Sequence, residues 1–334
     1  MRAATPSVDV TWDVVRAALL NAADSPERKG EVAELMAAVL DKYIQSPDFA
    51  TYFQRWQAAG VHVTPVHFYS PIPDTSQLGD HLWEGHTQLA GVDLAEERQL
   101  ALLRTFTQFQ DEYDAIPFDP TGRAGEYHLN NPMFSGVDAL VLYCMIRRFK
   151  PSSIIEIGGG HSTRLMVDAT RRNGPTRITT VEPHPGGLLA LGVLPVTLID
   201  QRVQDLPLSL FESLRAGDVL FIDSSHVVTI GGDVSYLFLE VLPRLAPGVL
   251  VHIHDVFLPR AQPREWVVDH MRFWCEQDLL QAFLAFNRDF EIVLANAFLG
   301  LRHEAALRDV FPRSPWWDRG GSFWLRRVDG SGGS

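Results

Sequence analysis

The amino-acid sequence predicts an α/β protein built on one doubly wound, Rossmann-like sheet of seven strands. Two observations carry this prediction. From about residue 137 onward, short β-rich runs alternate with segments that are able to form helices. The first of these runs, 153–157, ends in three consecutive glycines directly before a helical segment. Alternation of this kind implies parallel strands that are joined by right-handed helical crossovers.

Composition and charge exclude several classes of protein. The chain has 334 residues, of which 46% are hydrophobic and 21% are charged, as in ordinary globular domains. Its 29 Lys and Arg residues against 41 Asp and Glu residues give a net charge of −12, which does not suit a nucleic-acid binder. Two cysteines are too few for a disulfide framework. Because no segment reaches the ~20 apolar residues of a membrane helix, we expect a soluble, cytoplasmic protein without a membrane partner.

The first 124 residues are expected to form a helical region of their own. Ser25-Pro26 and Ser46-Pro47 each place a capping residue before a proline, which is a signal for the start of a helix. An apolar stripe with helical spacing follows each signal, and we expect the aromatic residues between 49 and 56 to lie in a core. Prolines between 62 and 80 predict an ordered loop. We expect residues 1–124 to cap the main domain, where they would serve a substrate pocket or a homodimer interface.

Residues 125–329 are expected to form the main domain, and residues 330–334 a flexible glycine- and serine-rich tail. Further helices are expected over 94–109, ahead of this domain, over 137–149, before the first strand, and over 263–286, before the last two strands. The strands are expected at 153–157, 177–182, 196–199, 219–223, 249–254, 290–295 and 322–327.

The glycine loop after the first strand predicts a ligand site. Gly158 and Gly160 allow the backbone to approach a ligand closely, at a helix start that offers free amides. Thr163 stands where a nicotinamide-cofactor fingerprint needs its third glycine, which weakens a dehydrogenase interpretation. Glu156 beneath the loop would repel a pyrophosphate and attract an ammonium group. Glu182, at the tip of the second strand, is able to accept both hydrogen bonds of a ribose diol, so an adenosine ligand that carries an amino acid fits best.

A second group of polar side chains follows the fourth and fifth strands. Asp223 ends the fourth strand, and His254 and Asp255 end the fifth. Neighbouring strands lie ~4.8 Å apart, and ligands bind at the carboxyl ends beside the switch point of the sheet. Two carboxylates and one imidazole are plausible ligands for a divalent cation. Structural alternatives stay open here: a helix cap for Asp223, a turn for Asp255 and a core histidine for His254.

Together these residues resemble class I S-adenosylmethionine (SAM)-dependent methyltransferases over roughly residues 125 to 327. The resemblance is to metal-dependent O-methyltransferases of the catechol and macrolide-sugar types. It implies that Gly158 and Gly160 contact the methionine end of SAM, that Glu182 binds the ribose hydroxyls and that Gln204 lies along the adenine. Glu156 is expected to bind the cofactor as well.

The same resemblance assigns chemical roles to the second group. His226 stands where these families place a general base, although it would also serve as a fourth metal ligand. His254 replaces an acidic or amide ligand, so Mg²⁺ is less certain and Mn²⁺, Fe²⁺ or Zn²⁺ becomes possible. The expected function is therefore methyl transfer from SAM to a hydroxyl of a small molecule, with a divalent metal at Asp223, His254 and Asp255. The alternatives are an oxidative iron enzyme that uses His226 and His254, and a non-catalytic SAM-binding module.

Overall fold

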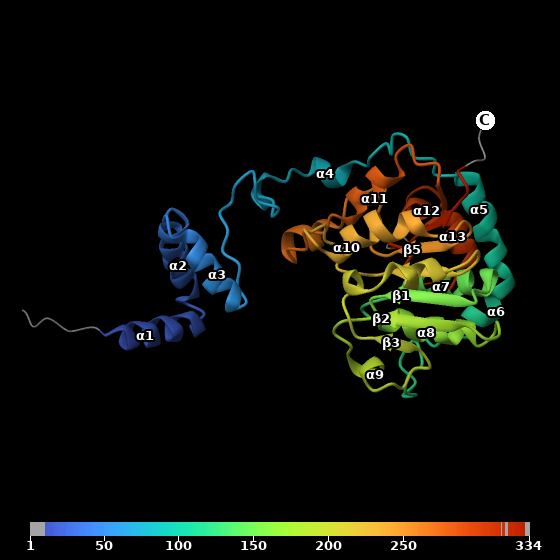
Figure 1. Cartoon of the computed structure of the whole chain (residues 1–334), viewed down its shortest axis with the longest axis horizontal. Coiled ribbons are helices and arrows are strands. Elements are labelled where there is room, and N and C mark those ends of the chain that lie inside the picture. The colour runs from blue at the N-terminus through green and yellow to red at the C-terminus, as the bar shows by residue number, and fades with distance from the viewer. Residues whose placement is uncertain (1–10, 315, 318–319, 331–334) are drawn as a thin grey trace, which may run out of the picture. The chain divides into compact units, whose positions relative to one another are not determined.

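The computed structural model describes residues 11–314, 316–317 and 320–330, and the chain divides after Gln77 into two compact units. The first unit is helical, as the sequence predicts, and is drawn in blue in Figure 1. Its helices are α1 (Trp12–Asp24), α2 (Lys29–Ile44) and α3 (Phe49–Ala58), with a 3₁₀ turn at Thr75–Gln77.

The expectation that the aromatics of the first unit form a core is wrong. None of the described residues of α1, α2 or α3 is buried. The aromatic side chains are instead half-buried and contact one another, as Tyr43 and Trp56 do with ring centroids 5.5 Å apart. Three helices of 13, 16 and 10 residues carry too little apolar surface to enclose a core.

The second unit contains the predicted seven-stranded sheet. The strand order is β3-β2-β1-β4-β5-β7-β6; the pairs from β3 to β5 are parallel, and β7 runs antiparallel to both of its neighbours. The central strands are buried on both faces, which explains their continuous apolar sequence. The strands are β1 (Ser153–Ile157), β2 (Arg177–Val181), β3 (Thr197–Ile199), β4 (Val219–Ile222), β5 (Leu250–Ile253), β6 (Phe290–Ala295) and β7 (Phe323–Arg327).

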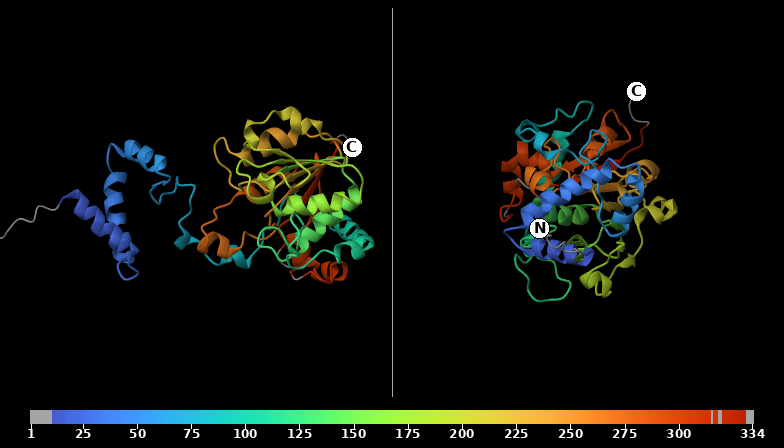
Figure 2. Two further views of the ribbon diagram at one scale, coloured as in Figure 1. Left: turned by 90° about the horizontal axis from the view of Figure 1, so that it is seen from below. Right: turned by 90° about the vertical axis from the view of Figure 1, so that its left-hand side faces the viewer.

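Helices cover both faces of this sheet, as Figure 2 shows. The helix α7 is buried along most of its length, and it packs against α8. The α-helices of this unit are α4 (His81–Glu84), α5 (Glu96–Thr105), α6 (Gln110–Tyr113), α7 (Gly136–Phe149), α8 (His161–Thr170), α9 (Gly187–Ala190), α10 (Asp233–Tyr236), α11 (Glu276–Leu284), α12 (Asn296–Arg302) and α13 (Glu304–Val310). Shorter 3₁₀ or π turns are η2 (Phe106–Phe109), η3 (Val203–Asp205), η4 (Leu208–Ser213), η5 (Leu237–Val241), η6 (Leu242–Arg244) and η7 (Glu265–Asp269).

The prediction of one long helix over 263–286 is wrong for the middle of that segment. A π turn covers Glu265–Asp269 and α11 begins only at Glu276. Between them Met271 adopts a left-handed backbone conformation with φ of +55°, which a helix does not allow. The amides of Cys275 and Glu276 donate to the carbonyl oxygen of His226, at 3.0 and 3.2 Å. Tertiary hydrogen bonds therefore fix the start of α11.

The expectation that residues 1–124 cap the main domain stays a prediction. Helix α5 and the residues up to 124 belong to the same compact unit as the sheet. Residues 331–334 of the expected tail lie outside the described residues. Within the described part of the chain, the helices are too short or too polar to cross a membrane.

Two features of the β1–α8 connection fix the glycine loop. Gly158 has φ of +82°, and a Cβ atom there would lie 1.9 Å from the carbonyl oxygen of Asp223. Beneath the loop, both carboxylate oxygens of Glu156 accept hydrogen bonds from hydroxyls. The donors are Ser162 at 2.7 Å, Thr163 at 2.7 Å and Thr180 at 2.8 Å. The loop is thus held between the end of β4 and a buried carboxyl group.

We predict that Gly158→Ala destabilises the protein by at least about 2 kcal/mol, since the new methyl group would force the backbone of Asp223 to move. Urea unfolding measures this change. Gly186→Ala is the matched control, because Gly186 is extended and its Cβ would meet no atom within 4 Å. Equal stability of the two variants would contradict the close approach at Gly158.

A second prediction concerns the pH dependence of stability. Burial raises the pKa of Glu156 to about 7, although hydrogen bonds from three hydroxyls oppose the rise. Because folding raises this pKa from 4.5, the protonated form of Glu156 is favoured in the folded state. The contribution of Glu156 to the free energy of unfolding is therefore complete below pH 4.5 and is lost as the pH rises through 7. The wild type should lose about 3 kcal/mol across this range through this group.

Glu156→Gln should remove that part of the pH dependence, which unfolding curves between pH 4.5 and 8 would measure. Glu212→Gln, which removes the same charge from an exposed position, serves as the control. The prediction fails if the stability difference between wild type and Glu156→Gln is the same at every pH.

Candidate active site

The residues that directly follow four parallel strands lie in one row at the carboxyl edge of the sheet. The amide of Gly158 donates to Val181 at 2.9 Å, and that of Asp223 donates to Ile157 at 2.8 Å. The amide of His254 donates to Ile222 at 2.9 Å. The strand pairing thus continues one residue past each strand and brings Glu182, Gly158, Asp223 and His254 side by side in that order.

One half of this row joins the glycine loop to the tip of β2. The carboxylate of Glu182 accepts hydrogen bonds from the amides of Gly159 at 3.3 Å and His184 at 2.8 Å. The amide of Gly160 donates to the Thr163 hydroxyl at 2.9 Å. The structure therefore brings Gly158, Gly160 and Glu182 together as the sequence predicts, and their contact with a cofactor stays a prediction.

Two other predicted cofactor residues lie at the margins of this half. Glu156 is fully buried beneath the loop, with its oxygens on three hydroxyls. Gln204 is half-buried on η3, and its amide nitrogen lies 3.5 Å from the carbonyl oxygen of Gly231 in the loop after β4. Their roles toward a cofactor also stay predictions.

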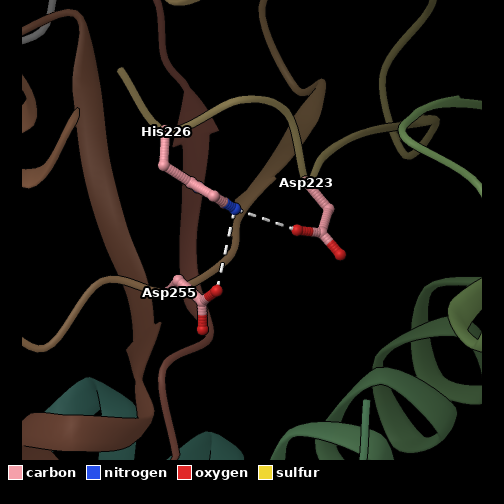
Figure 3. Close-up of side chains that lie close together, drawn as sticks. All are labelled: Asp223, His226 and Asp255. Carbon is pink, nitrogen blue, oxygen red and sulfur yellow. Dashed lines mark ion pairs between the residues drawn. The ribbon is translucent and has the colours of Figure 1, made fainter. Parts of the chain in front are cut away.

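The other half of the row gathers carboxylates around an imidazole. Nε2 of His226 lies 3.2 Å from Oδ1 of Asp223 and 3.6 Å from Oδ2 of Asp255. Figure 3 shows the imidazole of His226 pointing between the two carboxylates. One donor atom from each of the three residues lies within 4.8 Å of the others, which suits a shared cation.

His254 presents a second imidazole to the same carboxylates. Its Nδ1 lies 3.5 Å from Oδ1 of Asp223 and 3.6 Å from Oδ1 of Asp255. Its neighbour along the strand, His252, points elsewhere: Nε2 pairs with the Ser322 hydroxyl at 2.8 Å, and burial holds the pKa of His252 well below its ordinary value. His252 is thus a packing residue and lies outside the group of carboxylates.

Two carboxylates that the sequence did not indicate lie behind these imidazoles. Oε2 of Glu276 lies 2.8 Å from Nδ1 of His226. Oδ2 of Asp138 lies 3.6 Å from Nε2 of His254, and Asp138 also accepts bonds from the amides of Gly321 and Ser322. The only signal for Asp138 was an acidic residue on the otherwise apolar helix α7, and Glu276 resembles an ordinary acid in the first turn of a helix.

The electrostatics of this group demand positive charge. Burial would lower the pKa of His226, but hydrogen bonds to Asp223 and Glu276 raise it to about 9. Burial would also lower the pKa of His254, but the carboxylates of Asp255 and Asp223 outweigh this effect and hold that pKa well above 6.5. Four carboxyl groups surround the two imidazoles, and burial raises the pKa of two of them, Asp255 and Glu276. A divalent cation would stabilise the ionised form of these crowded carboxyl groups.

A cavity of about 640 Å³ adjoins the group on one side. Asp138, His254 and Asp255 line it, whereas Asp223 and His226 do not. The aromatic side chains on its wall are Trp83, Phe257, Trp266 and Trp316. Another cavity, of about 530 Å³, lies away from the group beside α8.

Comparison with known proteins agrees with this architecture. A family model described as a methyltransferase domain matches residues 155–256. An uncharacterized protein of Archaeoglobus fulgidus is 34% identical over 161 residues, which are 45% of this chain and 73% of that protein.

Solved structures of methyltransferases are also similar. The methyltransferase PaMTH1 of Podospora anserina, bound to S-adenosylhomocysteine (SAH), is 19% identical, with 68% of this chain and 88% of that one covered and a TM-score of 0.40. The O-methyltransferase TomG of Streptomyces achromogenes, bound to SAM, is 17% identical, with 68% and 90% covered and a TM-score of 0.38.

The family model spans the strands that carry the glycine loop, Glu182, Asp223 and Asp255, and the archaeal relative is matched over most of its length. This chain belongs to the class I SAM-dependent methyltransferases.

Proposed function

We propose that this protein transfers the methyl group of SAM to a hydroxyl oxygen of a small molecule, with a divalent cation at Asp223, His226 and Asp255. One observation carries the proposal. The glycine loop touches the end of β4, because a Cβ atom at Gly158 would lie 1.9 Å from the carbonyl oxygen of Asp223. A cofactor on the loop would therefore lie directly beside the carboxylate group.

The cofactor half supports binding of SAM. SAM, when bound, supplies a methyl group on a sulfonium that is already activated for transfer, so the protein needs mainly to align the reactants and remove a proton. Gly158 and Gly160 would approach the methionine end, Glu182 would bind the ribose hydroxyls and Gln204 would lie along the adenine. Glu156 would act from beneath, since its hydrogen bonds to Ser162 and Thr163 hold the loop.

The carboxylate half fits a divalent cation. Two carboxylate oxygens and one imidazole nitrogen suit Mn²⁺ or Fe²⁺ somewhat better than Mg²⁺, which prefers oxygen ligands. A bound cation would supply a Lewis acid that raises the acidity of the acceptor hydroxyl. Asp223 and Asp255 would hold it from two neighbouring strand ends.

The geometry favours exchanging the roles that the sequence suggested for the two imidazoles. His226 belongs to the group of three donor atoms and does not line the cavity. His254 lines the cavity, and Asp138 lies behind its Nε2. We therefore place His226 among the ligands and assign to Nδ1 of His254 the acceptance of the proton from the acceptor hydroxyl.

The aromatic cavity is the proposed site of the acceptor. It reaches the row at His254 and Asp255, so a hydroxyl there would lie next to both the base and a ligand carboxylate. Trp266 and Phe257, whose ring centroids are 5.3 Å apart, contribute apolar surface that excludes water.

We predict that Asp223→Ala lowers turnover by at least about 100-fold, because it removes a ligand carboxylate, while the affinity for SAH changes little. Formation of SAH with a panel of phenolic and sugar hydroxyl acceptors measures turnover, and calorimetry measures binding. Asp309→Ala, which makes the same change at an exposed position of α13, is the control and should keep the turnover of the wild type. Undiminished turnover in the presence of a chelator would contradict the metal. Oxygen uptake without methyl transfer would favour the iron-dependent oxidation.

The two imidazoles should separate in kinetics. His226→Gln should weaken Mn²⁺ binding about 10-fold or more, because it removes a ligand. His254→Gln should keep Mn²⁺ affinity and lower kcat by about 100-fold, because it removes the base. Titration with Mn²⁺ and steady-state kinetics at saturating SAM distinguish them. The reverse pattern would mean that His226 is the general base and His254 is a cation ligand.

A further inference from the structure

Glu276 is buried in direct contact with His226, and it lies outside the part of the chain that the methyltransferase family model matches. It is the first residue of α11 and is 2% exposed. Oε2 lies 2.8 Å from Nδ1 of His226, whereas Nε2 of the same ring faces Asp223 and Asp255. The imidazole thus lies between one carboxylate on one side and the proposed cation ligands on the other.

The segment that carries Glu276 holds His226 at three points. The amides of Cys275 and Glu276 donate to its main-chain carbonyl oxygen. The indole of Trp274 packs on its ring with centroids 4.4 Å apart. His226 has a left-handed backbone with φ of +60°, which is unusual for a residue other than glycine. Holding a residue in that conformation requires surrounding contacts of this kind.

We propose that Glu276 is a positioning residue of the cation site. It accepts the Nδ1–H of His226, so that Nε2 keeps its lone pair and faces Asp223 and Asp255. This inference rests on the proposed cation at those residues. A neutral imidazole carries one ring proton, and fixing it at Nδ1 leaves Nε2 as a ligand atom. Ligand histidines almost always donate their other ring N–H to such a partner.

The cost of burying Glu276 points to the same role. Among the described residues, its second oxygen, Oε1, has no hydrogen-bond partner. A buried carboxylate with one oxygen unpaired is unfavourable for folding, so the position does not simply stabilise α11. Asp138 holds a comparable place behind His254, but its bonds to Gly321 and Ser322 also join α7 to the start of β7. Glu276 therefore gives the cleaner test.

The test measures binding of Mn²⁺ alone to the full-length protein, by the electron paramagnetic resonance signal of free Mn²⁺. Glu276→Gln should weaken binding 10- to 100-fold, since the amide is a poorer acceptor and is able to donate to Nδ1, which moves the ring proton to Nε2. Glu276→Asp keeps the charge and should lose less affinity. SAH affinity should stay within about twofold for both variants, which shows that the fold is intact.

Glu96→Gln is the matched control. Glu96 accepts a hydrogen bond from His303 at 2.7 Å, so it is a carboxylate–histidine pair remote in sequence from the cation ligands. The Glu96→Gln variant should bind Mn²⁺ with the affinity of the wild type. With diamagnetic Zn²⁺ bound in place of Mn²⁺, side-chain ¹⁵N shifts of His226 should show the proton on Nδ1 in the wild type and its displacement in Glu276→Gln, a change that a merely structural role would not produce.

The outcomes separate the two proposals. Wild-type affinity for Mn²⁺ in Glu276→Gln overturns the role of Glu276 and leaves the cation site standing. A wild-type protein that does not bind Mn²⁺ overturns the cation site itself and this inference with it. Loss of SAH affinity together with Mn²⁺ affinity in Glu276→Gln would make Glu276 a general structural residue and would likewise overturn its positioning role.

Discussion

The parallel register at the carboxyl edge of the sheet is the constraint on which the site depends. Backbone hydrogen bonds continue one residue past β1, β4 and β5, so Gly158, Asp223 and His254 are placed by the sheet itself. Ligand residues on a rigid sheet edge lose little conformational entropy when they act. The close approach of the loop to Asp223 then joins the glycine-loop half of the row to the carboxylate half, and it admits only glycine at position 158.

Much of this edge could be predicted from the sequence because it depends on local patterns. Apolar strands that end in glycine or an acid give both the sheet and the positions Glu182, Asp223 and Asp255. Which nitrogen of each imidazole faces the carboxylates could not be predicted. His226 lies three residues past β4, and its left-handed backbone, which a strand pattern does not reveal, turns the ring toward Asp255.

The remaining parts of the site depend on contacts between distant segments. Asp138 and Glu276 come from helices on either side of the family match, and neither has a motif around it. The break in the expected helix over 263–286 has the same origin, because the amides at 275 and 276 bond to the carbonyl oxygen of His226. Helical periodicity reports a local preference, and tertiary hydrogen bonds override it here.

The arrangement of charges connects the stability of this edge to its chemistry. Each imidazole lies between a carboxylate of the row and a buried carboxylate behind it, and each such buried ion carries a desolvation cost. Burial raises the pKa of Asp255 and Glu276, even though protonated imidazoles lie beside them. A divalent cation between Asp223 and Asp255 would stabilise the ionised carboxylates and leave Nδ1 of His254, which faces these two carboxylates, with a free lone pair. The cost of crowding these carboxyl groups thus favours binding of the cation, and in the cation-bound state His254 is able to accept a proton.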